Sequence, residues 1–415
     1  MEYNFDSIFP RYNGFDPRVP VWCVTPDVDR AIHRFFDTSP ISPSGRYLAL
    51  TQLHSEEKLP EPGETAEVVV IDLATGENRI VAETKGWDTQ LGAQVQWGKY
   101  DTQLFFNDVD TREWRPFGVK MNIFSGERIS LDGTIYMVSP DGRYALSPCL
   151  ARIGATQPGY GVIVPAENVP KNQGLPDDDG IYITDTKSGK SRLLVSIKTI
   201  VETAVPSINM DEFENGTFYG FHVKWNPQGT RIMFVLRFLS AGKKYEPMLI
   251  TMKPDGTDIR LAIPASEWAV KGGHHPNWYP DGEYILMNLK IDQKELRFVK
   301  ARYDGSQYGV LVEGVTGSGH PTLHPNGTKI LTDSYVDEMT AFSDGTTPIR
   351  LVDMRTAEVI DLIRIRTKPA YSGPKKELRV DPHPAWDPTF RYIVFNACPE
   401  GKRKVFIADI SSFVD

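Results

Sequence analysis

The feature that most constrains the fold is an eight-residue pattern that recurs seven times along the 415-residue chain. A polar or aromatic residue opens it, an aromatic or aliphatic residue stands fourth, and proline and glycine often stand sixth and eighth. The clearest copies are residues 222–229 (HVKWNPQG), 275–282 (HPNWYPDG) and 320–327 (HPTLHPNG). Weaker copies are residues 38–45, 94–101, 135–142 and 383–390. Self-similarity of this kind indicates an array of one structural unit.

Each copy precedes a short run rich in β-branched and aromatic residues, and a third such run follows. The Asp-Gly and Asn-Gly pairs between the first two runs are strong hairpin signals. The pattern therefore predicts an all-β, seven-bladed β-propeller with four antiparallel strands per blade, spanning residues 1–415 as a single domain. The last unit is one strand short, and residues 19–25 (VPVWCVT) are predicted to complete it and protect both free edges of the ring.

Charge and hydropathy restrict the function. The chain has 46 Lys and Arg against 54 Asp and Glu, a net charge of −8, which argues against a nucleic-acid groove. No apolar run reaches the roughly 18 residues of a membrane helix, so no membrane partner is expected. The N-terminus shows no export signal, which favours a cytoplasmic location, or a secreted or periplasmic one if such a signal had been removed. Cys23, Cys149 and Cys398 are expected to be free thiols, and the sequence does not indicate an oligomeric state.

Four of the eight histidines occupy the first position of the pattern, in blades four to seven: His222, His275, His320 and His383. Equivalent positions in a propeller lie at one height around the channel, so these imidazoles are predicted to bind one divalent metal ion. Nitrogen ligation favours zinc or manganese over calcium, although calcium stays an option. The expected role is structural. Asp381 and Gln94 could add oxygen ligands, and the alternative is that each histidine caps its own blade by bonding the backbone.

A second set of residues is predicted to lie on one face of the propeller: His33, His54, Tyr136 and Arg152. β-Elimination on a uronic acid needs a cation for the carboxylate, a base, and an acid for the departing oxygen. Arginine binds carboxylates in a bidentate manner, while histidine and tyrosine transfer protons. On residue types alone, a solvated surface is an equally open interpretation. Arg237, with the long 153–179 segment, is a further candidate for substrate binding.

The chain resembles the seven-bladed polysaccharide lyases, most of all the ulvan lyases and rhamnose–glucuronate lyases. The likeness rests on the His33–His54 pair, 21 residues apart, and the Tyr136–Arg152 pair, 16 apart. It implies a lyase that cleaves at C4 of glucuronate or iduronate linked to rhamnose and leaves an unsaturated uronide. It further implies that His33 and His54 supply the base and help neutralise charge, that Tyr136 is the acid or acid/base, and that Arg152 holds the carboxylate.

A more distant resemblance, through HPNWYPDG and the segment around His383, is to oligogalacturonate lyase, a propeller with a histidine-bound metal. Three alternatives stay open: an oligogalacturonate-lyase-like enzyme with a catalytic metal, a propeller glycoside hydrolase, and a non-catalytic binding module. Most glycoside hydrolases need a pair of carboxylates, and no such pair stands at the repeat positions on the face predicted to carry His33, His54, Tyr136 and Arg152, which argues against a hydrolase. The expected partner is an acidic polysaccharide or oligosaccharide.

Overall fold

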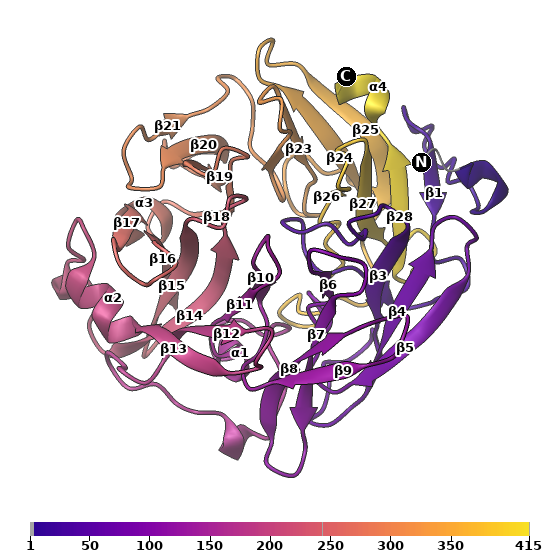
Figure 1. Cartoon of the computed structure of the whole chain (residues 1–415). Coiled ribbons are helices and arrows are strands. Elements are labelled where there is room, and N and C mark those ends of the chain that lie inside the picture. The colour runs from indigo at the N-terminus through magenta and orange to yellow at the C-terminus, as the bar shows by residue number, and fades with distance from the viewer. Residues whose placement is uncertain (1–3, 243, 415) are drawn as a thin grey trace. The chain divides into compact units, whose positions relative to one another are not determined.

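The computed structural model describes residues 4–242 and 244–414, and these residues form a seven-bladed β-propeller of four-stranded antiparallel sheets (Figure 1). Contacts between residues divide the chain into two compact units. Unit 1 comprises residues 1–109, 121–128 and 318–415, and unit 2 comprises residues 110–120 and 129–317. Folding as a single cooperative domain stays a prediction.

Unit 1 contains the first, sixth and seventh sheets. The first sheet consists of β2 (Ala31–Ile32), β3 (Tyr47–Gln52), β4 (Ala66–Asp72) and β5 (Asn78–Thr84). The sixth consists of β22 (Thr322–Leu323), β23 (Lys329–Thr332), β24 (Thr346–Asp353) and β25 (Val359–Arg366). The seventh consists of β26 (Ala385–Trp386), β27 (Tyr392–Ala397), β28 (Lys404–Asp409) and β1 (Val21–Cys23).

Unit 2 contains the third to fifth sheets. The third consists of β10 (Met137–Val138), β11 (Tyr144–Ser147), β12 (Gly180–Asp185) and β13 (Ser191–Ser196). The fourth consists of β14 (Gly216–Trp225), β15 (Ile232–Ser240), β16 (Tyr245–Met252) and β17 (Arg260–Ile263). The fifth consists of β18 (Gly273–Trp278), β19 (Tyr284–Leu289), β20 (Arg297–Arg302) and β21 (Gly309–Val310).

The residues of the second sheet are divided between the units; its strands are β6 (Gln96–Trp97), β7 (Leu104–Asp110), β8 (Arg115–Met121) and β9 (Arg128–Leu131). The helices are short: α1 (Leu150–Ile153), α2 (Ile197–Thr203) and α3 (Ala265–Trp268) lie in connections between strands, and α4 (Ser411–Val414) follows β28. Three 3₁₀ turns cover Phe5–Ser7, Ala166–Asn168 and Met210–Glu212.

The repeat produces the turn between the first two strands of each blade. Its last residue donates its backbone N–H to the residue three positions earlier, as Gly45 does to Ser42 and Gly282 does to Tyr279. The backbone there has positive φ, which glycine adopts without a steric penalty. The glycines concerned are Gly45, Gly142, Gly229, Gly282 and Gly327, with φ of 81°, 74°, 67°, 71° and 72°. Glycine is therefore the favoured residue at this turn, although Phe390 adopts the same positive φ of 58° in the seventh sheet.

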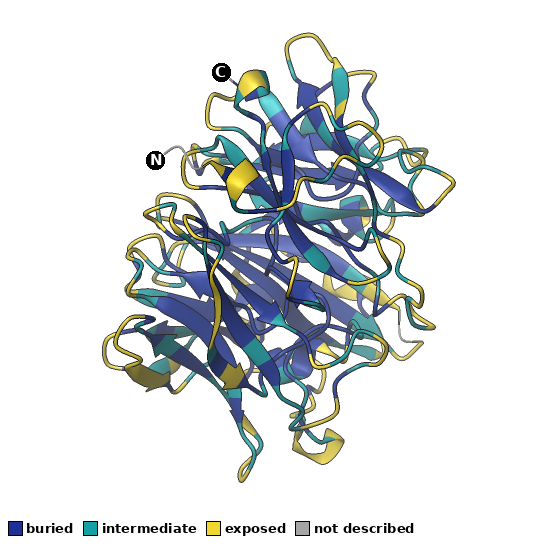
Figure 2. Ribbon diagram, turned by 90° about the vertical axis from the view of Figure 1, so that its right-hand side faces the viewer, coloured by how far each residue is buried: buried dark blue, intermediate teal, exposed yellow. Residues whose placement is uncertain are grey.

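The N-terminal strand closes the seventh sheet, as predicted. β1 pairs antiparallel with β28, with Val21 opposite Ala408 and Cys23 opposite Phe406, and Figure 1 shows these two ends of the chain side by side. Behind this closure, apolar side chains of the first 25 residues, including Phe5 and Trp22, pack with those of the first and seventh sheets. The strands are mostly buried and the exposed residues lie mainly in the turns (Figure 2).

The first sheet differs from the prediction in where its innermost strand lies. We expected that strand inside residues 38–45, with His33 before it, but β2 is Ala31–Ile32 and His33 follows it. Within residues 38–45 only Ile41 forms an isolated bridge, to Leu48. Pro40 and Pro43 have no N–H to donate, so a continuous ladder cannot form there. All three cysteines are free, as expected.

Candidate functional site

The first position of the repeat lies where the innermost strands depart from regular β geometry. Gln94, His275 and His383 have φ of 58°, 58° and 49°, and His222 lies where the register of β14 shifts between Gly220 and Val223. Positive φ is uncommon for residues other than glycine, and bulges turn side chains away from their regular direction, often beside functional sites. Several blades thus share a backbone irregularity at this position.

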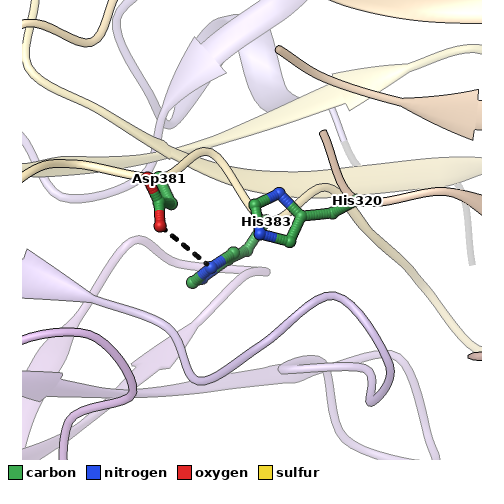
Figure 3. Close-up of side chains that lie close together, drawn as sticks. All are labelled: His320, Asp381 and His383. Carbon is green, nitrogen blue, oxygen red and sulfur yellow. Dashed lines mark ion pairs between the residues drawn. The ribbon is translucent and has the colours of Figure 1, made fainter. Parts of the chain in front are cut away.

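In unit 1, two of these histidines meet a carboxylate. The possible ligand atoms of His320, Asp381 and His383 lie within 4.8 Å of one another, and all three residues are buried (Figure 3). Nε2 of His383 is 3.8 Å from Oδ2 of Asp381, and the His320 and His383 rings stand edge to face with centroids 4.4 Å apart. We call these three residues the imidazole cluster.

His320 is oriented by a carboxylate that the sequence analysis missed. Its Nδ1 lies 2.9 Å and 3.0 Å from the two carboxylate oxygens of Asp333, which also accepts the His320 backbone N–H at 2.6 Å. Asp333 immediately follows β23 and is fully buried. A carboxylate on the far nitrogen of an imidazole is the usual support of a metal-binding histidine. The only sequence signal was an aspartate at the end of a blade's second strand.

His383 and the neighbouring His33 are buried imidazoles whose nitrogens have no hydrogen-bond partner in good geometry among the residues that the structure describes. Their ring centroids are 6.5 Å apart, and the ring of Phe35 packs on His383 at 4.8 Å. Burial lowers the pKa of His33 to about 3, opposed by the nearby backbone of Pro382 and His383, and burial also lowers the pKa of His383 well below its usual value. Both imidazoles are therefore neutral at pH 7, which is the form that binds metals.

The donor set of the imidazole cluster fits a divalent transition metal. Two imidazole nitrogens and one carboxylate oxygen suit manganese, iron or zinc. A buried polar atom without a partner is costly, and His383 has two such atoms. Arg379 holds Asp381 in place, with Nη2 2.8 Å from Oδ2. Asp381 thus lies within reach of both histidines, where the oxygen ligand suggested by the sequence would have to be.

The other two histidines of the predicted metal site lie in unit 2, where each has a different neighbour. Nδ1 of His222 is hydrogen-bonded to the hydroxyl of Tyr136, and Nδ1 of His275 is 2.8 Å from Nδ1 of His274. The structure thus brings together His320 and His383 within unit 1. A site shared by all four histidines stays a prediction.

Tyr136 and His222 form the core of a second group in unit 2. Tyr136 is fully buried, and the rings of Phe221 and Tyr160 lie 3.9 Å and 6.4 Å from the His222 ring. A phenol hydrogen-bonded to an imidazole has a built-in partner for proton transfer. The sequence singled out both residues but assigned them to different sites, because their pairing depends on two separate blades.

Arg152, expected to hold a substrate carboxylate, is instead paired within the protein. It lies on α1, with Nη1 3.1 Å from Oδ1 of Asp179 and Nη2 3.8 Å from Oδ2 of Asp178. Asp179 is buried and also accepts a hydrogen bond from Asn172 at 2.7 Å. Arg237, on β15, lies buried among aromatic rings.

The structure does not bring His54 to His33. β2 and β3 pair with Ala31 opposite Gln52, so the chain beyond Gln52 runs away from the end of β2 where His33 lies. His54 is exposed and lines a cavity of about 360 Å³ with Arg30, Glu67 and Glu83. Within the described residues, no helix is both long and apolar enough to cross a membrane.

Comparisons with known proteins establish the fold. No model of a protein family matches the chain, and neither does any curated protein sequence. Among solved structures it is similar to an oligogalacturonate lyase in complex with manganese, with a TM-score of 0.67 and 14% identity over 97% of this chain and 96% of that one. Oligogalacturonate lyase from Vibrio parahaemolyticus gives a TM-score of 0.66 at 14% identity, with the same coverage.

A propeller from another kind of enzyme is also similar. The β-propeller domain of the Trilobed protease from Pyrococcus furiosus gives a TM-score of 0.52 at 11% identity over 92% of this chain and 96% of that one. At these identities the likeness shows a propeller fold that lyases and peptidases share. The reaction must be argued from this chain's own residues.

Proposed function

We propose that this protein is a lyase that cleaves an acidic, uronic-acid-containing oligosaccharide by β-elimination, with oligogalacturonate as the first substrate to test. The observation that carries the proposal is the imidazole cluster, in which His320, Asp381 and His383 offer buried ligand atoms within 4.8 Å of one another. The fold of an oligogalacturonate lyase in complex with manganese supports this choice. Rhamnose-linked glucuronate or iduronate, as in ulvan, is the second substrate class.

In this reaction a base removes the proton next to the carboxylate, at C5. The electrons of that C–H bond form the C4–C5 double bond, and the C4–O bond breaks. The leaving oxygen takes a proton from an acid, so no water is consumed. A divalent metal bound by the imidazole cluster would supply positive charge that stabilises the carboxylate as its α-carbon loses the proton.

Within unit 2, Tyr136 and His222 are the pair best suited to transfer a proton. Their hydrogen bond lets the phenol give up or receive a proton while the imidazole compensates. His33 suits this role less well, because an imidazole whose pKa is about 3 is a weak base at neutral pH. We therefore assign His33 to the surroundings of the imidazole cluster, where a neutral ring is the required form.

The test is to incubate the purified protein, with manganese or zinc, with oligogalacturonate and with ulvan oligosaccharides. A lyase generates ultraviolet absorbance from the unsaturated uronide together with new reducing ends. New reducing ends without that absorbance would indicate a glycoside hydrolase instead. Binding with no product from any uronate oligomer would favour a non-catalytic binding protein.

A further inference from the structure

Arg237 is a buried arginine whose charge has no carboxylate partner. The residue is 7% exposed. Its guanidinium carbon lies 3.4 Å from the centroid of the Phe221 ring and 4.5 Å from that of Tyr245. Among the described residues no acidic side chain forms an ion pair with it, although buried arginines are nearly always paired.

The hydrogen bonds of Arg237 leave one edge of the guanidinium unused. Nη1 donates to Oε1 of Gln157 at 3.1 Å and to Oγ1 of Thr156 at 3.5 Å, and both acceptors are neutral. Nε is buried without a partner, and no bond from Nη2 is recorded among the described residues. Nε and Nη2 together form the fork that binds a carboxylate through two parallel hydrogen bonds.

Arg231, another buried arginine of unit 2, has the acidic partner that Arg237 lacks. Arg231 is also 7% exposed and also stacks on an aromatic ring, that of Tyr303 at 3.7 Å, but its guanidinium is bonded to the carboxylate of Asp258. Arg152 is likewise paired, with Asp179. Arg237 therefore differs from both in lacking an acid, while the rings of Phe221 and Tyr245 fix its plane.

We infer that Arg237, and not Arg152, binds a carboxylate of the ligand in unit 2, through its Nε and Nη2 atoms. The choice of a uronate as that ligand rests on the proposed function. The ring of Phe221 lies 3.4 Å from the guanidinium carbon of Arg237 and 3.9 Å from the His222 ring, which places Arg237 near the Tyr136–His222 pair. Burial lowers its pKa to about 10, so the guanidinium stays charged at neutral pH and able to attract an anion.

The test compares Arg237→Met with Arg231→Met, since methionine keeps much of the volume and removes the charge. The probes are galacturonate and its neutral counterpart galactose, followed through the arginine Nε–H resonances of ¹⁵N-labelled protein. In the native protein we expect galacturonate, but not galactose, to shift one Nε–H signal that is missing in Arg237→Met. Trigalacturonate measured by calorimetry should bind Arg237→Met at least tenfold more weakly, and Arg231→Met with unchanged affinity provided that variant is folded.

Stability gives an independent readout. Arg231→Met removes the buried ion pair with Asp258, which then keeps only Arg260, and should lower the melting temperature, whereas Arg237→Met should leave it unchanged or raise it. No galacturonate-dependent shift in the native protein, or an Arg237→Met variant that binds trigalacturonate normally, would overturn the inference. A shift at Arg237 in a protein that forms no unsaturated product would instead sustain the inference and reject the proposed function.

Discussion

The carboxylate of Asp333 is hydrogen-bonded to Nδ1 of the His320 imidazole, and its two oxygens lie 2.9 Å and 3.0 Å from that nitrogen. This contact fixes both the orientation and the tautomer of the ring, because an ionised carboxylate can only accept a hydrogen bond. Nδ1 must then carry the proton, so Nε2, which lies 3.4 Å from the hydroxyl of Tyr335, is the nitrogen that would bind a metal. Asp333 thus prepares one ligand of the imidazole cluster.

Asp333→Asn should weaken metal binding by roughly 10- to 100-fold, the usual effect of changing a residue that supports a metal ligand. The amide can still accept the backbone N–H of His320, so the fold should persist. Affinity for zinc or manganese, measured by competition with a chromophoric chelator, checks this expectation. Unchanged affinity with normal circular dichroism would mean that Asp333 does not prepare His320 for metal binding.

The purified protein should contain about one divalent metal ion. A ligand that binds only the native state stabilises it by mass action, by about 2.7 kcal/mol at a hundredfold excess over Kd, so a strong chelator should lower the melting temperature. His383→Ala and Asp381→Ala should reduce metal content in elemental analysis. His324→Asn, at a histidine outside the cluster, is the control that keeps it. Equal metal content in all three variants would contradict this assignment.

Tyr136→Phe should lower turnover by roughly two to four orders of magnitude while substrate binding persists, because the ring stays and the transferable proton is lost. Initial rates of unsaturated-product formation, with calorimetric binding of a uronate trisaccharide, measure both effects. Tyr279→Phe is a matched control: Tyr279 is also buried in unit 2, and its hydroxyl has no hydrogen-bond partner. Normal rates in Tyr136→Phe would place the proton transfer elsewhere.

The sequence predicted the fold well because the repeat encodes local backbone geometry. A glycine at a turn with positive φ, followed by a β-rich run, is a signal that needs no distant partner, so blades and hairpins could be counted directly. The closing strand was predictable for a similar reason. The last unit lacked a strand, and the run around Val21 could supply it.

The site was less predictable because it depends on pairings between segments far apart in sequence. The partnership of Tyr136 with His222 and that of Arg152 with Asp179 leave no local pattern, so each residue was judged alone. His33 and His54 were expected on one face of the propeller because the first strand was assumed to lie within residues 38–45, whereas β2 lies before that segment, which contains two prolines. The pairing of Asp333 with His320 could not be predicted for the same reason as that of Asp179 with Arg152, because the residues next to each aspartate in the sequence do not indicate its partner.

The buried imidazole of His33 should make the metal-free protein sensitive to mild acid. Its pKa is about 3 in the folded state, lowered mainly by burial, against about 6.5 when unfolded. Between these values the unfolded chain binds more protons, so stability is fully present above pH 6.5 and falls as the pH drops toward 3. His383 acts in the same direction.

Urea unfolding at pH 7.5 and pH 5, in the presence of a chelator, tests this dependence. His33→Gln should lose less stability on acidification than the native protein, because one of the groups that must charge is gone. His54→Gln, at an exposed histidine, should show the same loss as the native protein. If His33→Gln and the native protein fall equally, His33 is not a source of the acid sensitivity.

Arg152→Met should destabilise the protein strongly, since it leaves Asp179 without its cation. The two side chains are 8% and 2% exposed and 3.1 Å apart, and removing one partner of a buried pair typically costs 3–5 kcal/mol. Burial raises the pKa of Asp179 while Arg152 opposes that rise, so the variant's Asp179 should take up a proton more readily. The loss in the free energy of unfolding should therefore be larger at pH 7.5 than at pH 5, where a neutral acid needs no counter-charge.

Arg152→Met with Asp179→Asn should recover part of the loss at pH 7.5, because no unpaired charge remains. A stable Arg152→Met variant that has lost substrate affinity would instead return to Arg152 the carboxylate-binding role that the sequence first suggested.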